Sequence, residues 1–259
     1  MTAMENRLVY EHPLNKRIRT LLRIENLFGR LQHYSKSTDA QDMRLSVTLL
    51  IDLNELLKLS DTRTELAREL ERCQSALRAL EGKPGVDTYK LKQILNDLNE
   101  CIETIRDNDC QPGATLDRDE LITSIKQKDS LAGGACNFDL PAYNFWLNKP
   151  TRARQKSLQG WQEDLAIIRK STELVLSLTR SNAITKKETA EGGFYQQSIE
   201  SGAPYQLIRI ITSRELKCFP EISGGKHRIT VRFMEQAETQ NRPVQTEKDV
   251  KFELHFCVS

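Results

Sequence analysis

The sequence of 259 residues lacks the features of several large protein classes. No stretch approaches the roughly 18 consecutive apolar residues that mark a membrane-spanning helix, so we expect no membrane span. Residues 1–11 contain no apolar run of the kind found in a secretory signal peptide. The six cysteines are scattered without a C-x-x-C or C-x-x-H pair, which is typical of reduced thiols in a cytosol. The sequence therefore predicts a cytoplasmic protein with no membrane partner.

Motifs of catalysis and of cofactor binding are also missing. The chain contains no G-x-S-x-G, H-E-x-x-H or G-x-G-x-x-G sequence. The four histidines do not have the spacing of metal ligands. The segment Gly224-Gly225-Lys226-His227 lacks the spacing and the hydroxyl residue of a phosphate-binding loop. We therefore expect a binding protein that is not an enzyme, with no catalytic residue, no metal ion and no cofactor.

One enzymatic alternative remains open around Cys136. This cysteine follows two glycines, and it could act as a nucleophile with His227 as its base. Nothing in the sequence orients such a base, so a buried thiol in a loop is the favoured interpretation. An enzyme of this kind would lose its activity on Cys136→Ala.

The charges of the chain are nearly balanced. Lys and Arg number 38 against 36 Asp and Glu, which gives a net charge of +2. This balance argues against a protein whose whole surface coats nucleic acid, although a local basic patch is compatible with it. The hydrophobic content of 38% is that of a globular chain with a real core.

Helical periodicity dominates the first two thirds of the chain. Expected helices cover residues 15–34, 39–59, 116–128, 143–147 and 151–180. The clearest pattern is a pair of heptad seams, formed by Leu66, Leu70, Cys73, Leu77 and Leu80 and by Leu91, Leu95, Leu98, Ile102 and Ile105. The helix-breaking residues 82–85 lie between the two seams, so they predict an antiparallel helical hairpin.

The last third of the chain has the alternating pattern of strands. Residues 205–212, 226–234 and 250–256 are rich in β-branched and aromatic residues, and turn residues separate them. They predict a small, mostly antiparallel sheet with one buried face, which a strand at residues 7–10 joins. The predicted fold class is therefore α+β. A large α-helical domain with the helical hairpin covers residues 14–181, and a small β domain covers residues 1–13 and 182–259.

Basic residues gather on two of these expected elements. Arg19, Arg23 and Arg30 recur at helical spacing, while Lys226, Arg228 and Arg232 share one face of a strand. This face is either an ordinary solvated surface or a docking surface for a peptide that carries carboxylates, which suit Arg. A nucleic-acid-binding regulator would use the same arginines. That alternative is less favoured, because no aromatic side chain for base stacking is expected among them.

Several ordered blocks of the sequence resemble the ZapD family of bacterial division factors, almost from end to end. These blocks are residues 10–15, 19–25, 63–70, 84–87, 133–141, 146–147, 193–196, 222–234 and 252–257. The resemblance implies a homodimer with a helical and a β domain. It implies binding to the C-terminal tail of FtsZ and bundling of FtsZ protofilaments at the division site, at midcell, which stabilises the Z-ring.

The resemblance also implies a basic recognition surface. The matching positions in this sequence are Arg19, Arg23, Arg63, Arg228 and Arg232, and Lys226 shares the strand face of the last two. Two positions depart from the family pattern, since some relatives carry Arg where this chain has Glu120 and His where it has Asn144. Contacts through these two positions are therefore not carried over.

Overall fold

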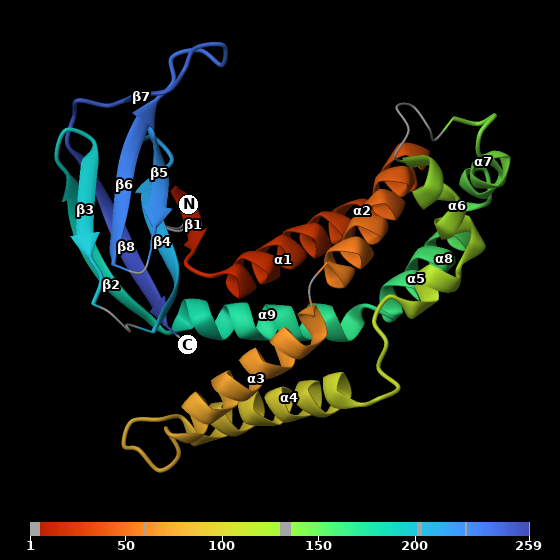
Figure 1. Cartoon of the computed structure of the whole chain (residues 1–259), viewed down its shortest axis with the longest axis horizontal. Coiled ribbons are helices and arrows are strands. Elements are labelled where there is room, and N and C mark those ends of the chain that lie inside the picture. Colours follow the sequence, from red (N-terminus) through yellow and green to blue (C-terminus); the bar gives the residue numbers. More distant parts are fainter. Residues whose placement is uncertain (1–5, 60, 130–135, 201–203, 226, 259) are drawn as a thin grey trace. The chain divides into compact units, whose positions relative to one another are not determined.

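The computed structural model describes residues 6–59, 61–129, 136–200, 204–225 and 227–258 (Figure 1). The fold class is α+β, with helices in the first part of the chain and antiparallel strands in the last. The chain divides into two compact units. Met1–Arg19 and Leu176–Ser259 form the β unit, and Thr20–Val175 form the helical unit. The divisions fall inside the helices α1 and α9.

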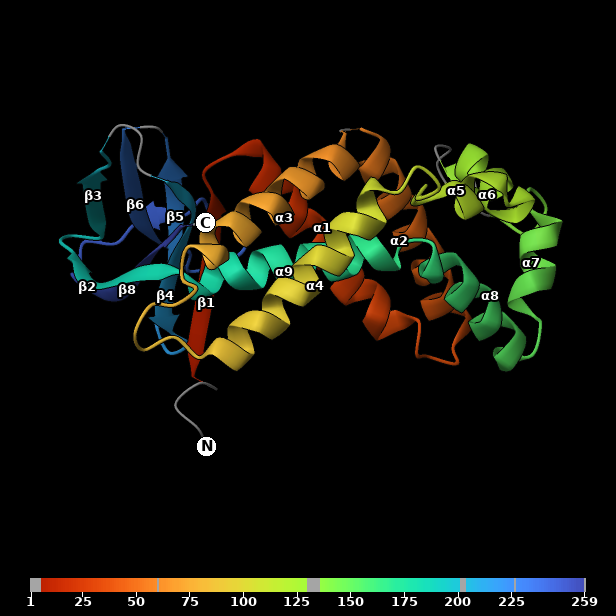
Figure 2. The ribbon, with the colours of Figure 1, turned by 90° about the horizontal axis from the view of Figure 1, so that it is seen from below.

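Figure 2 shows the helices, and those outside the two segments 114–129 and 151–181 begin and end close to the residues that the sequence predicts. They are α1 (Lys16–Tyr34), α2 (Ala40–Lys58), α3 (Thr62–Arg78), α4 (Thr88–Arg106), α5 (Ala114–Arg118), α6 (Glu120–Asp129), α7 (Pro141–Leu147), α8 (Thr151–Glu163) and α9 (Ala166–Ser181). The backbone N–H of Ile18 donates to Asn15 Oδ1 at 2.9 Å, and Asp39 caps α2 in the same way. These side chains satisfy backbone N–H groups that a helix start leaves without partners.

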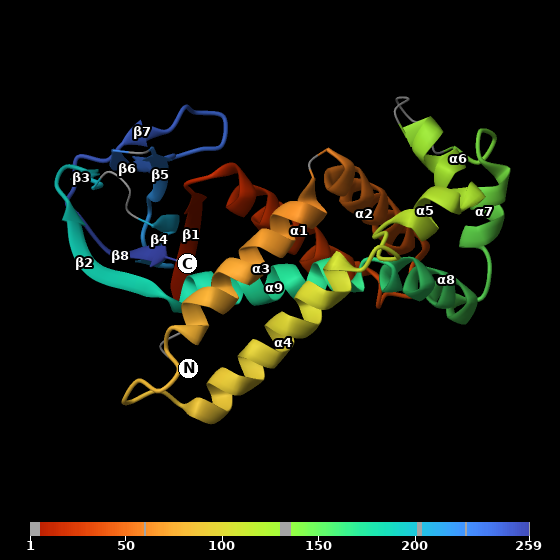
Figure 3. The same ribbon diagram turned by 60° about the horizontal axis from the view of Figure 1, so that its bottom comes forward.

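The predicted helical hairpin is formed by α3 and α4, which lie side by side (Figure 3). Leu70 and Cys73 of α3 and Leu98 and Cys101 of α4 are among its buried seam residues. Burial of the Cys73 thiol raises its pKa to about 11, so this cysteine behaves as a small hydrophobic residue. The structure therefore confirms most of the two heptad seams as apolar packing faces. Leu80 is the exception, because α3 ends at Arg78 and Leu80 is exposed beyond it.

Two expected helices are each divided by an aspartate. The helix expected over residues 116–128 is α5 followed by α6, and Asp119 lies between them. Asp119 Oδ1 accepts from the Ile122 N–H at 3.0 Å, and its Oδ2 accepts from Trp161 Nε1 at 2.9 Å. The helix expected over residues 151–180 ends as α8 before Asp164, whose Oδ2 accepts from the Thr115 N–H at 2.9 Å. Such side-chain bonds compete with helical hydrogen bonding, so both single-helix predictions were wrong.

The β unit contains two antiparallel sheets, whereas the sequence predicted one. Sheet A has the order β1 (Arg7–Pro13), β4 (Tyr205–Ser213), β8 (Val250–Val258) and β2 (Ala183–Ala190). Sheet B has the order β3 (Phe194–Ser198), β6 (Arg228–Glu235) and β5 (Phe219–Gly224), and β7 (Val244–Gln245) also pairs with β6. The prediction missed β2, β3, β5 and β7 because these strands are short or polar and have no clear apolar alternation.

The core of the β unit is built from the inner faces of both sheets. Its members from sheet A include Ile210, Leu254 and Phe256, and those from sheet B include Val231 and Phe233. The ring centroids of Phe233 and Phe252 are 5.3 Å apart, so aromatic packing joins the two sheets directly.

A second set of contacts ties strands and helix together on the outer face of sheet A. Glu11 of β1 accepts from Arg180 Nε at 2.9 Å and from Arg180 Nη2 at 2.8 Å. The same carboxylate lies 3.0 Å from Arg209 Nε of β4. The side chains of all three are about four-fifths buried. Burial lowers the pKa of the neighbouring His255, and the charge of Arg209 lowers it further.

Removal of the Phe233 side chain tests the core of the β unit. Phe233→Ala leaves a cavity between the sheets, and we expect the free energy of unfolding to fall by about 3–5 kcal/mol. Urea unfolding followed by circular dichroism measures this loss. Thr230→Ala is the matched control on the same strand, and its side chain lies on the opposite face. Equal losses for the two variants would contradict this account of the core.

Candidate functional site

The candidate site begins with the outer face of β6. Ile229, Val231 and Phe233 are buried, while Arg228 and Arg232 are exposed and Thr230 is half-buried between them. We call Arg228, Thr230 and Arg232 the basic face. The alternation that the sequence predicts for this strand is therefore confirmed. Lys226, which the sequence places on the same face, lies outside the described residues.

The basic face lines a groove of about 1030 Å³, the β5–β6 groove. Its lining consists of Glu221, Ile222, Ser223, Gly224, Gly225, His227, Arg228, Thr230 and Arg232. The strand register puts Arg232 opposite Glu221 and Thr230 opposite Ser223. The groove therefore presents two guanidinium groups with one carboxylate and two hydroxyl groups.

Sheet B places an aromatic side chain beside the basic face. Phe194 of β3 lies directly opposite Arg232, and 39% of its surface is exposed. The expectation that no aromatic residue accompanies the arginines was therefore wrong. Sequence patterns carry little signal for this residue, because Phe194 belongs to a short strand that follows two glycines. An exposed ring next to a guanidinium offers an apolar or stacking contact to a ligand.

Arg19 lies in the same unit as this groove. It is exposed on the first turns of α1. Burial lowers the pKa of His12, and the positive charge of Arg19 lowers it further, so the two residues are electrostatic neighbours. A β-carbon on Gly224, at the end of β5, would lie 3.3 Å from His12 Nε2. His12 thus connects the neighbourhood of Arg19 with the β5 end of the groove.

The other two predicted arginines belong to the helical unit, and their surroundings differ. Arg23 is exposed on α1, in line with Arg19. Arg63 donates from Nε to the Ile105 carbonyl at 2.7 Å and from Nη2 to the Asp107 carbonyl at 2.6 Å. Arg63 therefore bonds the Ile105 carbonyl in the last turn of α4 and the carbonyl of the C-cap residue Asp107. The last carbonyls of a helix have no intrahelical partners. The sequence gives no sign of this role.

The positions that depart from the family pattern also lie in the helical unit. Glu120 is exposed at the start of α6. Asn144 in α7 is half-buried, and both its carbonyl oxygen and its Oδ1 accept from Asn148 Nδ2.

The structure changes the interpretation of Cys136. The sequence favoured a buried thiol, but Cys136 is exposed just before α7. Its suggested base His227 is exposed in the β unit. Within the described ranges, no group of three or more His, Cys, Asp or Glu side chains is placed to hold a metal ion. None of the helices that the structure describes is both long and apolar enough to cross a membrane.

Comparison with known proteins places the chain among cell division proteins. The family description "ZapD: Cell division protein" matches residues 22–232. "Cell division protein ZapD" of Methylococcus capsulatus is 35% identical over 255 residues, which cover 98% of this chain and 100% of that protein. The proteins of the same name from Cupriavidus taiwanensis and Nitrosomonas eutropha are each 35% identical, over 251 and 252 residues. Both matches cover 96% of this chain and 99% of the relative.

The chain belongs to the ZapD family. Its role therefore lies in cell division, and the family is described as a cell division protein and not as an enzyme.

The bonds of Arg63 predict a structural cost for its removal. Arg63→Ala deprives two carbonyls of a charged donor, and we expect the free energy of unfolding to fall by about 1–3 kcal/mol. Arg68→Ala on the exposed face of the same helix is the control, and we expect a change within about 0.5 kcal/mol. Urea titrations of both variants measure the difference. If Arg63→Ala is as stable as the wild type, Arg63 is not a cap of α4.

Proposed function

We propose that this protein binds the C-terminal tail of FtsZ through a basic surface and cross-links FtsZ protofilaments at midcell, in the cytoplasm. The observation that carries the proposal is the β5–β6 groove, where Arg228 and Arg232 are exposed on one strand face beside Phe194. The family membership supports the cell division context.

The groove has the properties that an extended peptide requires. The guanidinium groups of Arg228 and Arg232 leave the same strand face four residues apart, so they can bind carboxylates about four residues apart on an extended peptide, in geometry that suits Arg forks. Phe194 supplies an apolar surface beside them for a side chain of the tail. Most of this face is exposed, so salt screens the attraction between the arginines and the carboxylates of the tail. The affinity of a single binding site is therefore low.

Bundling requires more than one binding site in each molecule. A single binding site decorates a filament, whereas two sites on a two-fold homodimer connect two filaments. In this proposal each weak contact is repeated along the filaments, so the contacts add up to a stable bundle through avidity. The proposal therefore includes a homodimer that carries one groove on each subunit.

The other predicted site residues contribute to this proposal in different ways. Arg19 adds positive charge near the β5 end of the groove, and Arg23 extends the cationic stripe of α1. Lys226 stays a partner-binding residue predicted from the sequence alone, because it lies outside the described residues. Arg63 contributes by holding the end of α4. Nucleic acid, metal ions and cofactors have no part in this function.

A second candidate function is a nucleic-acid-binding regulator that uses the same arginines. The position of Phe194 opposite Arg232 favours it, because a ring beside a guanidinium can stack on a base. A gel-shift assay at physiological salt separates the two functions, since phosphate-driven binding retards any duplex. A shift that Phe194→Ser and Arg232→Glu both abolish would favour the regulator.

The tail dependence of binding is the first prediction of this function. Co-sedimentation of the purified protein with polymerised FtsZ should give bundles, and FtsZ that lacks its C-terminal tail should give none. The reason is that the groove fits a flexible extended segment and not a folded surface. Pelleting with both forms of FtsZ would place the contact outside the tail, and pelleting with neither would remove FtsZ as the partner.

Charge reversal on the basic face is the second prediction. Arg228→Glu together with Arg232→Glu should reduce bundling to the background level, because both forks for carboxylates become repulsive. The circular dichroism spectrum and the dimer should be unchanged, because both side chains are exposed. Pelleted FtsZ, quantified by densitometry, measures the effect.

The matched control for this variant is Arg152→Glu with Lys156→Glu. These two cations are exposed on α8 at the same spacing in sequence, so the total change in charge is identical. The control should bundle like the wild type, and its failure would indicate an effect of net charge alone. Normal bundling by the Arg228 and Arg232 variant would show that the basic face is the wrong surface. Higher salt should weaken wild-type bundling.

A further inference from the structure

Sheet B has an edge strand with a free side. β3 is the first strand in the order β3-β6-β5, and in the described part of the chain it pairs with β6 alone (Figure 1). The N–H of Phe233 donates to the Gly193 carbonyl at 2.8 Å, just before β3 begins. The N–H of Ile199 donates to the His227 carbonyl at 2.8 Å, just after β3 ends. These two bonds define which residues of β3 turn their backbone groups toward β6.

The outward residues of β3 are Gln196 and Ser198. Along an antiparallel strand, residues whose N–H and C=O groups bond one neighbour alternate with residues whose groups point the other way. Tyr195 and Gln197 therefore bond β6, and Gln196 and Ser198 turn both groups to the free side. The side chains of Gln196 and Ser198 are exposed, and neither residue has a hydrogen bond elsewhere within the described ranges. We call the free side of β3 the β3 edge.

The opposite edge of sheet B, along β5, is closed. The Gly225 N–H donates to the Arg228 carbonyl at 3.0 Å, so the alternation turns Pro220 to the free side of β5. Proline has no N–H to donate, and it protects a sheet edge against a further strand. Leu14 covers the end of this edge, since a β-carbon on Gly224 would lie 2.6 Å from Leu14 Cδ2. A peptide strand therefore cannot extend the sheet at β5.

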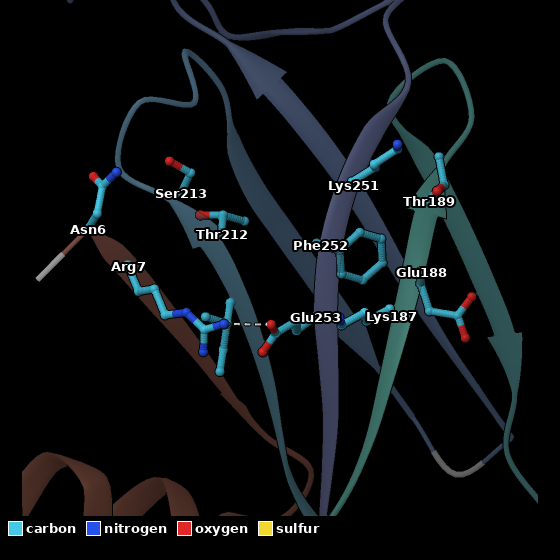
Figure 4. Close-up of a pocket in the computed structure, with 11 residues that line it drawn as sticks. Asn6, Arg7, Lys187, Glu188, Thr189, Thr212, Ser213, Lys251, Phe252 and Glu253 are labelled. Atoms are coloured by element: carbon cyan, nitrogen blue, oxygen red, sulfur yellow. Dashed lines mark hydrogen bonds and ion pairs between the residues drawn. The ribbon is translucent and has the colours of Figure 1, made fainter. Parts of the chain in front are cut away.

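β3 lacks the features that protect edge strands. In sheet A the edge strand β2 carries Lys186, Lys187 and Glu188 in succession, and Figure 4 shows Lys187 and Glu188. Charges of this kind oppose the addition of another strand. β3 has the sequence Phe-Tyr-Gln-Gln-Ser, which contains neither a charge nor a proline. The β3 edge is therefore open to a further strand.

The side chains next to the β3 edge belong to the same outer face as the two arginines of β6. Ser198 lies directly opposite Arg228, and its small side chain leaves room for the guanidinium to extend over β3. Phe194 lies directly opposite Arg232, and its exposed ring offers an apolar contact at the other end of β3. The described lining of the β5–β6 groove sets two arginines against the single carboxylate of Glu221. This face therefore attracts an acidic segment to the β3 edge.

We propose that an extended segment with carboxylate side chains, the C-terminal tail of FtsZ in the proposed function, binds as an added strand on the β3 edge. Its backbone pairs with the outward N–H and C=O groups of Gln196 and Ser198, as in recognition by strand addition. A carboxylate of the segment bonds Arg228, and an apolar side chain packs on Phe194. The inference rests on the proposed function for the identity of the segment, and it adds how the backbone of the segment is held.

A proline on the β3 edge tests the backbone contact. Gln196→Pro removes the outward N–H, while the bonds to β6 come from the neighbouring residues and stay. We expect the affinity for a fluorescent peptide of the FtsZ tail, measured by fluorescence anisotropy, to fall about tenfold. Gln196→Ala is the matched control, because it removes the side chain and keeps the N–H, and it should bind like the wild type. Wild-type affinity of the proline variant, or equal losses in the two variants, would refute the strand addition.

A second measurement leaves the protein unchanged. Tail peptides that carry one backbone N-methyl group, placed at each position in turn, each lack one N–H donor. An added strand turns every second N–H to β3, so methylation at alternate positions of the bound stretch should weaken binding about tenfold. Methylation at the positions between them should have little effect. Losses without this alternation would contradict the proposal even if the proline variant fails to fold.

Hydrogen exchange of the full-length protein locates the added strand. The amides of Gln196 and Ser198 should exchange rapidly in the free protein and slowly with the tail peptide, because they gain partners. Slow exchange in the free protein would show that a second copy covers the β3 edge, and would overturn the inference.

The inference and the proposed function fail in different ways. A tail peptide that binds through Arg228 and Arg232, but shows neither the alternation nor the protection of the β3 edge, would overturn the strand addition and leave the proposed function standing. A tail peptide that does not bind at all would overturn both.

Discussion

The burial of one side of β6 against sheet A is the constraint on which the candidate site depends. Ile229, Val231 and Phe233 are completely buried in the core between the sheets. A strand has a period of two, so burial of these side chains forces Arg228 and Arg232 to the outside. A shift of one residue in register would exchange the two faces, and would bury charges in place of aromatic and aliphatic groups. The core thus enforces the direction of the arginines.

The outer face of sheet A is organised by ion pairs, in contrast to the inner face. The carboxylate of Glu11 contacts guanidinium groups from α9 and from β4, and all three side chains are mostly buried. Such a network requires accurate geometry, because each charge loses its water and gains only its partners. It therefore holds β1 against its neighbours in one arrangement. At the other end of this face the ladder between β4 and β8 ends at Ile211 opposite Glu253, and Glu253 is ion-paired with Arg7 of β1.

Regular patterns made most of the fold predictable from the sequence. The heptads of the hairpin and the alternation of β6 each involve one local period, so each is visible without tertiary knowledge. The helix breaks at Asp119 and Asp164 depend on hydrogen bonds to residues far away in sequence. For the site, the sequence predicts the two arginines of β6, while Phe194 and the bonds of Arg63 emerge only from pairing and packing. The periodicity of a sequence predicts which face of a helix or strand is buried. It does not predict which distant residues contact that element.

The ladder between β4 and β8 ends at Ile211 opposite Glu253, although β4 continues to Ser213 and β8 begins at Val250, and this has a consequence for aggregation. A strand edge with free backbone groups invites pairing with the edge of another copy, and such pairing leads to sheets that grow between molecules. Lysines beside an edge oppose this, because two approaching copies bring like charges together. Lys251 of β8 has this position, beyond the last residue pair of the ladder, and it is exposed. Its positive charge therefore acts against pairing between the edges of two copies.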